Sequence, residues 1–238
     1  MRAGTSWLHR QTAAHPQVWT PRRKELHFFD RLLPETALRW AWVERLARWQ
    51  YQRIFWRGAL AGKVKGETTP AYAILESERI ALIHRWMPGL RLVYILRDPV
   101  ERAWSHARKD FLQFQGKTLD EVPKDELVAF FRSEGVVRRG DYAGCLERWL
   151  RFFPMEQLLV LFYEDIYSRP GGLLRELYAF IGVDPEFVPP GEVLTRRVNS
   201  RPPQPMPSEV RALLEEHLYP QNRRLEELLG RPLPWATG

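Results

Sequence analysis

The apolar positions of this chain fall into short unbroken runs and into longer stretches with helical spacing. Residues 90–96 (LRLVYIL) and 158–163 (LLVLFY) are almost wholly apolar, which predicts strands buried on both faces of a parallel sheet. Spacings of three and four predict helices over residues 35–56, 142–153, 173–181, 208–218 and 220–229, and another that follows the turn at 66–72 and stops at Pro88. The alternation of strands with helices predicts an α/β fold with a central parallel sheet flanked by helices.

The helix predicted over residues 35–56 carries an apolar stripe that is rich in tryptophan. Leu38, Trp42, Leu46 and Trp49 recur at intervals of three or four residues, and such a stripe indicates packing against a core. A cleft that faces carbohydrate is the alternative, because indole rings also stack on sugar rings. The polar segment 111–140 has only short helical patches and is predicted to line one side of a cleft.

The strand predicted at residues 90–96 ends abruptly in charged residues. Asp98 followed by Pro99 predicts a helix N-terminus, since aspartate caps a first turn and proline suits the first helical position. Arg97 stands at the carboxyl end of the strand, where open α/β sheets bind ligands. Ser105 lies eight residues later, about two helical turns on, so its hydroxyl and the guanidinium are predicted to meet one anion. An Arg-Asp pair that merely satisfies the strand end is the alternative.

The first residues of the chain have the composition of an anion-binding loop. Residues 2–6 (RAGTS) place a cation, a glycine and two hydroxyl groups before a predicted helix, and the N-terminus of a helix favours phosphate. Gly4 allows close approach of the backbone, and Thr5 and Ser6 add donors. No residues precede Met1 to form the strand that usually feeds such a loop, so this first strand is predicted to be missing. A disordered basic start is the alternative.

Glu25 and His27 form a candidate acid–base pair two residues apart. In an extended segment their side chains point to the same side, with Leu26 and Phe28 on the other. This arrangement suits general-base catalysis, and the alternative is a surface loop that holds an ion pair.

Composition narrows the possible partners and the number of domains. With 238 residues, a single domain over residues 1–238 is the simplest prediction, and 36 basic against 29 acidic residues give a net charge of +7, which suits an anionic ligand. The basic residues are dispersed among acidic ones without a nucleic-acid-reading motif, so no nucleic-acid partner is expected. The single cysteine, Cys145, excludes an internal disulfide and is predicted to lie in the core. The absence of a long apolar run or signal-peptide pattern predicts a soluble cytoplasmic protein without stable membrane insertion.

Five motifs occur in one order along the chain: residues 2–7 (RAGTSW), 24–30 (KELHFFD), 66–72 (GETTPAY), 96–105 (LRDPVERAWS) and 162–165 (FYED). This ordered set resembles the sulfotransferases that use 3′-phosphoadenosine 5′-phosphosulfate (PAPS), specifically the branch that modifies heparan-type glycans and its bacterial relatives. The resemblance covers nearly the whole chain, because residues 206–231 also look like the C-terminal helices of the family. It implies a P-loop-like three-layer sandwich.

The resemblance implies a role for each motif. The loop that holds the 5′-phosphosulfate is matched by Arg2, Gly4, Thr5, Ser6 and Trp7, and the pair that holds the 3′-phosphate by Arg97 and Ser105. Glu25 matches the catalytic base of glycan sulfotransferases, with His27 beside it, and Arg2 would stabilise the leaving phosphate. Tyr163 falls near the nucleotide edge. The loop that usually closes over the 3′-phosphate contains Asn199, Ser200 and Arg201, in a proline-rich segment that is otherwise interpreted as a linker.

The implied activity is in-line transfer of a sulfuryl group from PAPS to a hydroxyl or amine, with a carbohydrate as the expected acceptor. Glu25 would take the proton of the acceptor, and the other product would be 3′-phosphoadenosine 5′-phosphate (PAP). The chemistry requires no metal, and the sequence offers no ligand cluster for one. Two alternatives stay open: an N-terminally truncated homologue that binds the cofactor without turnover, and a nucleotide or sugar kinase. The kinase lacks support because the full G-x-x-x-x-G-K-S/T pattern is absent.

Overall fold

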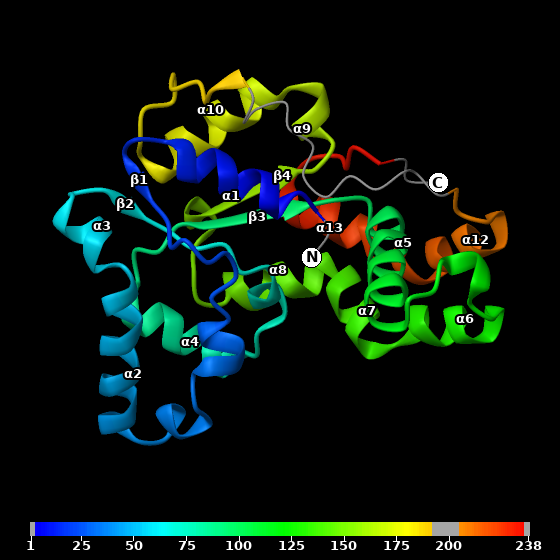
Figure 1. Cartoon of the computed structure of the whole chain (residues 1–238), viewed down its shortest axis with the longest axis horizontal. Helices are drawn as coiled ribbons and strands as arrows, with labels where there is room; N and C mark the ends of the chain where they lie inside the picture. The colour runs from blue at the N-terminus through cyan, green and yellow to red at the C-terminus, as the bar shows by residue number, and fades with distance from the viewer. Residues whose placement is uncertain (1–2, 192–204, 236–238) are drawn as a thin grey trace. The chain divides into compact units, whose positions relative to one another are not determined.

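The computed structural model of the chain describes residues 3–191 and 205–235, and these form two compact units. Residues 4–95 and 148–191 make the strand-bearing unit, and residues 3, 96–147 and 205–235 make the helical unit. The chain passes from one unit to the other near the end of a strand and within a helix (Figure 1). The single domain over residues 1–238 stays a prediction.

The strand-bearing unit holds the strands that were predicted and two shorter ones. Its strands are β1 (Val18–Trp19), β2 (Val64–Lys65), β3 (Leu92–Leu96) and β4 (Leu158–Phe162). Its helices are α1 (Thr5–Ala14), α2 (Ala41–Ile54), α3 (Trp56–Leu60), α4 (Ser77–Trp86), α9 (Asp165–Ser168) and α10 (Pro170–Ile181). Short helical turns cover Phe28–Leu32, Glu35–Leu38, Pro70–Ile74 and Met155–Gln157.

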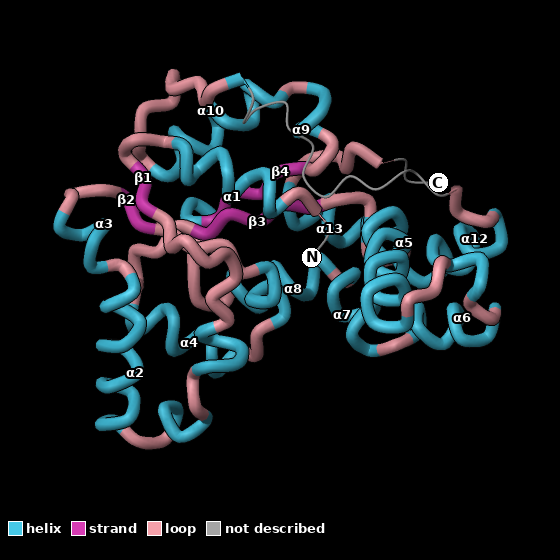
Figure 2. Tube along the Cα trace, viewed as in Figure 1, coloured by secondary structure: helices cyan, strands magenta, loops and turns pink. Residues whose placement is uncertain are grey.

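The strands pair in two small sheets, drawn in magenta in Figure 2. β3 pairs with β4, which confirms both strands predicted from apolar runs. β1 and β2 are parallel, with Val18 opposite Val64 and Trp19 opposite Lys65. At two residues each, β1 and β2 are too short to show the period-two pattern by which strands are predicted.

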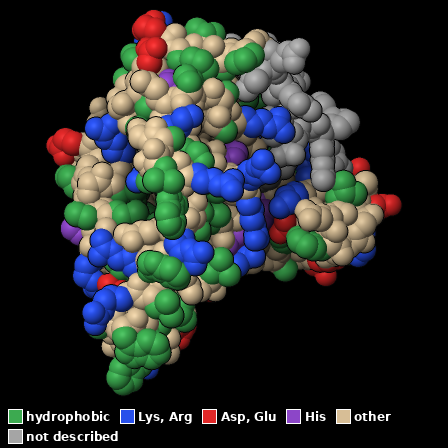
Figure 3. All heavy atoms as spheres, turned by 60° about the vertical axis from the view of Figure 1, so that its left-hand side comes forward, with side chains coloured by type: hydrophobic (Ala, Val, Ile, Leu, Met, Phe, Trp, Pro, Cys, Tyr) green, Lys and Arg blue, Asp and Glu red, His purple; other side chains and the backbone are tan. Residues whose placement is uncertain are grey.

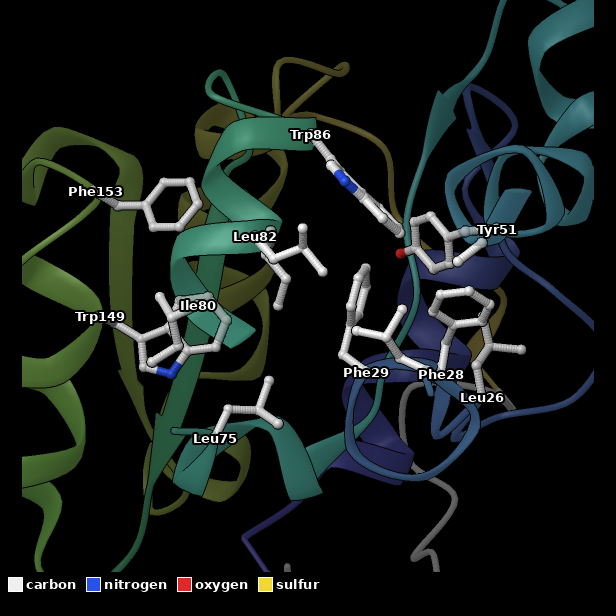
Figure 4. Packing of buried hydrophobic residues seen from close by; sticks show 13 residues of the cluster. Leu26, Phe28, Phe29, Tyr51, Leu75, Ile80, Leu82, Trp86, Trp149 and Phe153 are labelled. Atoms are coloured by element: carbon white, nitrogen blue, oxygen red, sulfur yellow. The ribbon is translucent and has the colours of Figure 1, made fainter. Parts of the chain in front are cut away.

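Aromatic and aliphatic side chains from distant parts of the chain make the core of the strand-bearing unit. The rings of Phe28 and Phe29 lie 4.9 Å and 4.8 Å from the ring of Tyr51, measured between centroids. Figure 4 shows Trp86 and Leu82 of α4 turned toward these rings, with Ile80, Trp149 and Phe153 packed beyond them. The predicted burial of Trp149 and Phe153 is confirmed. This core fixes the segment around residue 28 against α2 and α4.

The predicted burial of the tryptophan stripe on residues 35–56 is wrong. Trp42, Leu46 and Trp49 are between 48% and 66% exposed, and the opposite side of α2 contacts the core through Ala47 and Tyr51. The helix is also interrupted, since α2 begins at Ala41 and ends at Ile54. The core beside α2 is already filled by Phe28, Phe29 and Trp86, so the side of the helix without tryptophan packs there.

The helical unit has its own apolar core, built on α5 (Pro99–Asp110). The other helices are α6 (Lys124–Arg132), α7 (Glu134–Gly140), α8 (Tyr142–Leu150, its last residues in the other unit), α12 (Ser208–Leu218) and α13 (Asn222–Leu229), with helical turns at Phe111–Gln115 and Leu119–Glu121. Val100, Ala103 and Ala107 of α5 are fully buried, and they pack in one cluster with Leu214 and Leu218 of α12. Segment 111–140 contributes to this core; its role in a cleft stays a prediction. Cys145 is fully buried, as predicted.

Candidate functional site

The segment that carries Glu25 and His27 is not extended, so the geometry of a strand does not align the two side chains. Both residues adopt left-handed backbone angles, with φ of 63° at Glu25 and 54° at His27. These are the described non-glycine residues with positive φ, a conformation that costs energy and occurs mainly where surrounding contacts enforce it. The two side chains face each other nonetheless, because His27 Nε2 lies 3.5 Å from Glu25 Oε2.

Hydrogen bonds from the segment at residues 67–72 hold this loop in place. Glu25 N–H donates to the Thr68 carbonyl at 3.1 Å. Leu26 N–H donates to Thr69 Oγ1 at 3.0 Å, and Phe28 N–H donates to the hydroxyl of Tyr72 at 2.9 Å. The backbone amides of the loop therefore have partners outside the loop, and these partners compensate for its unfavourable backbone angles.

Glu67 connects the groups that hold the loop. Its carboxylate accepts hydrogen bonds from Tyr51 Oη and Thr69 Oγ1, each at 2.7 Å, and a longer one from Tyr72 Oη at 3.4 Å. Burial raises the pKa of the Glu67 carboxyl, and the three donors oppose that rise. Sequence reasoning noted the motif at residues 66–72 without giving Glu67 a role. Glu67 therefore links Thr69 and Tyr72, the two side chains whose hydroxyl groups accept hydrogen bonds from the loop amides.

A row of charged side chains runs along the same loop. Lys24 Nζ pairs with Glu25 Oε1, and His27 Nδ1 lies 2.8 Å from Asp30 Oδ2. Because a carboxylate only accepts hydrogen bonds, Nδ1 is the donor in its contact with Asp30, and Nε2 faces the Glu25 carboxylate. Lys24 and Asp30 were missed as site residues, although both lie in the motif KELHFFD at residues 24–30.

The arrangement has the parts of an acid–base site. Glu25 is the more accessible carboxylate, with a side chain 31% exposed, whereas Asp30 is 16% exposed beneath His27. Asp30 orients the imidazole of His27, and Nε2 of this ring faces the Glu25 carboxylate at 3.5 Å, so a carboxylate and an imidazole lie together on one loop.

Gly4 immediately precedes α1, at a position that disfavours any side chain. Its φ is 83°, and a Cβ built there would lie 2.4 Å from Ile166 Cδ1 and 3.0 Å from Tyr163 Cδ2. Ile95 of β3 is the third neighbour, at 3.4 Å. Tyr163, predicted at the nucleotide edge, thus lies against Gly4, and its hydroxyl is 2.9 Å from that of Tyr167.

The first turn of α1 has the features that an anion needs. The first helical bond runs from Leu8 N–H to the Gly4 carbonyl at 3.0 Å, and no acidic residue lies in the turn. Thr5 and Ser6 are half-buried there, whereas Trp7 is buried. His9 follows on α1, with Nδ1 3.3 Å from Thr68 Oγ1, and burial together with Lys24 and Arg10 lowers its pKa.

The helical unit contains the other predicted pair, Arg97 and Ser105. Asp98 caps α5 as predicted, because its Oδ1 accepts from Val100 N–H at 2.8 Å. Burial raises the pKa of Asp98, and hydrogen bonds from the first turn of α5 oppose this. Arg97 Nη2 lies 3.9 Å from Glu101 Oε2.

Glu101 and Tyr142 hold Arg97 in the helical unit. Glu101 also accepts from Arg211 Nη2 at 2.6 Å, so two cations share one carboxylate. Tyr142 Oη donates to the Arg97 carbonyl at 2.9 Å, and burial raises the pKa of this phenol to about 12. Arg97 is therefore held both through its side chain and through its backbone.

The remaining predicted site residues, Arg2, Asn199, Ser200 and Arg201, lie outside the described residues. Within residues 3–191 and 205–235, no group of three or more His, Cys, Asp or Glu side chains is arranged to hold a metal ion.

Comparisons with known proteins agree on one family. The model of the sulfotransferase domain matches residues 1–201. The human heparan sulfate glucosamine 3-O-sulfotransferase 6 is 29% identical over 262 residues, which cover 99% of this chain and 71% of its own length. The mouse heparan sulfate glucosamine 3-O-sulfotransferase 3B1 is 33% identical over 190 residues, or 76% of this chain. The chain spans only 44% of the length of this mouse relative.

Solved structures show the same likeness. A sulfotransferase from Alicyclobacillus acidocaldarius matches with a TM-score of 0.72 and 25% identity, over 98% of this chain and 93% of that one. The sulfotransferase domain from the curacin biosynthetic pathway shares the fold, with a TM-score of 0.56 and 16% identity over 98% of this chain and 95% of that one. The predicted fold class is thereby confirmed, and the chain belongs to the sulfotransferase family.

Proposed function

We propose that this chain transfers a sulfuryl group from PAPS to a hydroxyl or amine of a carbohydrate. The relatives at 29% and 33% identity are named as heparan sulfate glucosamine 3-O-sulfotransferases, which supports a glycan as the acceptor. The observation that carries the proposal is the row of Lys24, Glu25, His27 and Asp30 on one strained loop.

In the proposed mechanism, Glu25 accepts the proton of the attacking hydroxyl or amine. Asp30 keeps His27 oriented with Nε2 toward Glu25, so the imidazole stabilises the proton after transfer. General-base assistance of this kind contributes about 10²–10⁴-fold to a rate. The new bond forms between the acceptor atom and sulfur while the bond from sulfur to the bridging phosphate oxygen breaks, and PAP leaves.

The start of α1 fits the phosphosulfate end of PAPS. The left-handed Gly4 carries no side chain of its own, and the first turn of α1 presents amides and the hydroxyls of Thr5 and Ser6 without an acidic residue in that turn. Arg2 would add a cation for the departing phosphate. Arg97 and Ser105 are proposed to hold the 3′-phosphate, with Tyr163 at the nucleotide edge. Asn199, Ser200 and Arg201 lie outside the described residues, and the resemblance alone assigns them to the loop that closes over the 3′-phosphate.

Calorimetric titration with PAP is the first test. We expect the wild-type chain to bind PAP and Arg97→Ala to bind roughly ten- to a hundredfold more weakly, since a charge-assisted phosphate contact is lost. Arg223→Ala is the matched control, because its side chain is 89% exposed and pairs with Glu227 one turn later on α13. Binding equal in all three proteins refutes the assignment of Arg97.

Turnover is the second test, with labelled PAPS and a desulfated heparan-type glycan. Glu25→Gln should bind PAP normally and transfer sulfate about 10²–10⁴-fold more slowly, whereas the exposed control Glu78→Gln should match the wild type. PAP binding without transfer to any glycan would favour the inactive homologue. Transfer of phosphate from a nucleoside triphosphate would favour a kinase. The cytoplasmic location stays a prediction, and no helix in the described residues is long and apolar enough to cross a membrane.

A further inference from the structure

The outer side of α2 is an exposed apolar surface that the proposed activity does not use. At about 100° per residue, Trp42, Leu46 and Trp49 lie within about 60° of one another around the helix, and each is roughly half exposed or more. We call these three side chains the tryptophan face. The buried residues Ala47 and Tyr51 lie about 140° to 180° away from Trp42, so α2 has two apolar sides and the core of its unit covers one.

The segment of the chain that carries the tryptophan face is strongly basic. Residues 36–66 contain seven Lys or Arg and one acidic residue. That acidic residue, Glu44, is turned toward α4, where it accepts from Arg85 Nη2 at 2.7 Å and Trp86 Nε1 at 2.9 Å. Arg53 stacks on Trp49, with its guanidinium carbon 4.6 Å from the ring centroid. Figure 3 shows hydrophobic and basic side chains gathered at the lower end of the view, where α2 lies.

We propose that the tryptophan face docks this protein on the surface of an anionic lipid bilayer. Tryptophan and leucine are the side chains that partition into the interface between headgroups and acyl chains, and arginines beside them reach the phosphates of anionic lipids. Trp40 and Trp56, just outside α2 on either end, are also more than half exposed and extend the apolar surface along the chain.

Charge and polarity favour an anionic bilayer over two other partners, a second copy of the chain and an anionic glycan. A second copy of the chain would bring a second basic surface against the first, and like charges repel. An anionic glycan would engage the arginines, but it offers little apolar surface to Leu46 or to the full area of the indole rings. A bilayer satisfies both the apolar and the cationic groups of the face, and the docking is peripheral.

Vesicle co-sedimentation tests the proposal with phosphatidylcholine alone and with about a third phosphatidylglycerol. We expect the wild type to bind the mixed vesicles and to be released by high salt. Trp42→Ala/Trp49→Ala should bind at least about tenfold more weakly, and Arg45→Gln/Arg53→Gln should lose the preference for the anionic vesicles. The matched control is Leu112→Ala/Phe114→Ala, which removes exposed apolar groups of the other unit and should bind as the wild type does.

Melting curves should show that every variant is folded, because the altered side chains are exposed. The release of the wild type by high salt tests the proposal without any variant. The proposal is overturned if the wild type ignores both vesicles, or if the double tryptophan variant binds them equally well. It is also overturned if that variant loses retention on immobilised heparin but not on vesicles, which indicates a glycan. A wild-type dimer that the variant dissociates would indicate a second copy. PAP binding is measured separately, so failure here leaves the sulfotransferase proposal intact.

Discussion

Replacing Thr69 by valine should release the loop that carries Glu25 and His27. The hydroxyl of Thr69 is buried and serves two partners: it accepts from Leu26 N–H at 3.0 Å and donates to Glu67 Oε2 at 2.7 Å. Valine has nearly the same shape but neither donates nor accepts a hydrogen bond. Thr69→Val therefore orphans one buried amide and removes one donor from a buried carboxylate.

Typical free-energy costs are known for both the unpaired amide and the lost hydrogen bond. A buried amide without a partner costs about 1–3 kcal/mol, and a hydrogen bond to a charged group contributes about 1.5–3 kcal/mol. Because the two share one hydroxyl and Glu67 keeps two tyrosine donors, we expect a loss of roughly 2–5 kcal/mol in the free energy of unfolding. For a chain of this length, that corresponds to a fall in melting temperature of roughly 5–20 °C.

The loss should also depend on pH. Burial raises the pKa of Glu67 above its ordinary value of 4.5, so the stability associated with its neutral form is fully present below pH 4.5 and declines as pH rises through the folded pKa. A neutral carboxyl needs the Thr69 donor less than a carboxylate does. Thr69→Val should therefore cost more above neutral pH than in acid.

Urea unfolding of wild type, Thr69→Val and Thr69→Ser measures these effects. Serine keeps the hydroxyl and loses one methyl group, which costs about 1 kcal/mol or less. The rate of sulfate transfer should fall with stability in the valine variant only, since Leu26 lies between the two proposed catalytic residues. Equal midpoints for wild type and valine, or equal losses for serine and valine, would show that Thr69 does not hold the loop.

Three further predictions concern other parts of the molecule. Gly4→Ala should lower the free energy of unfolding by roughly 2–4 kcal/mol and weaken PAP binding in calorimetry, because both φ and the space around the Cβ are unfavourable. Gly62→Ala, with positive φ but open space, should cost only about 1–2 kcal/mol. Tyr142→Phe should leave the Arg97 carbonyl without its phenol donor, cost about 1–3 kcal/mol and weaken PAP binding. Burial, helped by nearby cations, lowers the pKa of His106 from 6.5 to about 3. The midpoint of urea unfolding should therefore fall as the pH drops across that range, and His106→Gln should make the midpoint depend less on pH.

The sequence predicts well those parts of the fold that are decided by local pattern. Strands β3 and β4 are apolar runs bounded by charged residues, and both form where that pattern places them. The cap at Asp98 follows from the chemistry of an aspartate before a proline, and both features appear at the start of α5. These elements need only their own residues and a buried environment on either side.

The tryptophan stripe shows where such reasoning fails. Periodicity shows that α2 has an apolar side, but it does not identify the side that faces the core. Val43, Ala47, Tyr51 and Ile54 form a second stripe on α2, and this one packs against the core cluster. The choice between the two stripes depends on the space left by Phe28, Phe29 and Trp86, which come from segments that the pattern of α2 does not contain.

The backbone geometry of the loop at Glu25 could not be predicted from its own residues for a related reason, and this geometry is informative about the site. An extended segment would have aligned the two side chains at no cost, whereas the structure uses two left-handed residues, each costing about 1–3 kcal/mol. Contacts 43 and 44 residues along the chain, at Thr69 and Tyr72, are what sustain this geometry. Burying a polar turn with a carboxylate at its centre itself costs free energy. It persists because Glu67, Thr69 and Tyr72 satisfy one another and the loop amides together, so neither the loop nor the turn is stable in this form without the other.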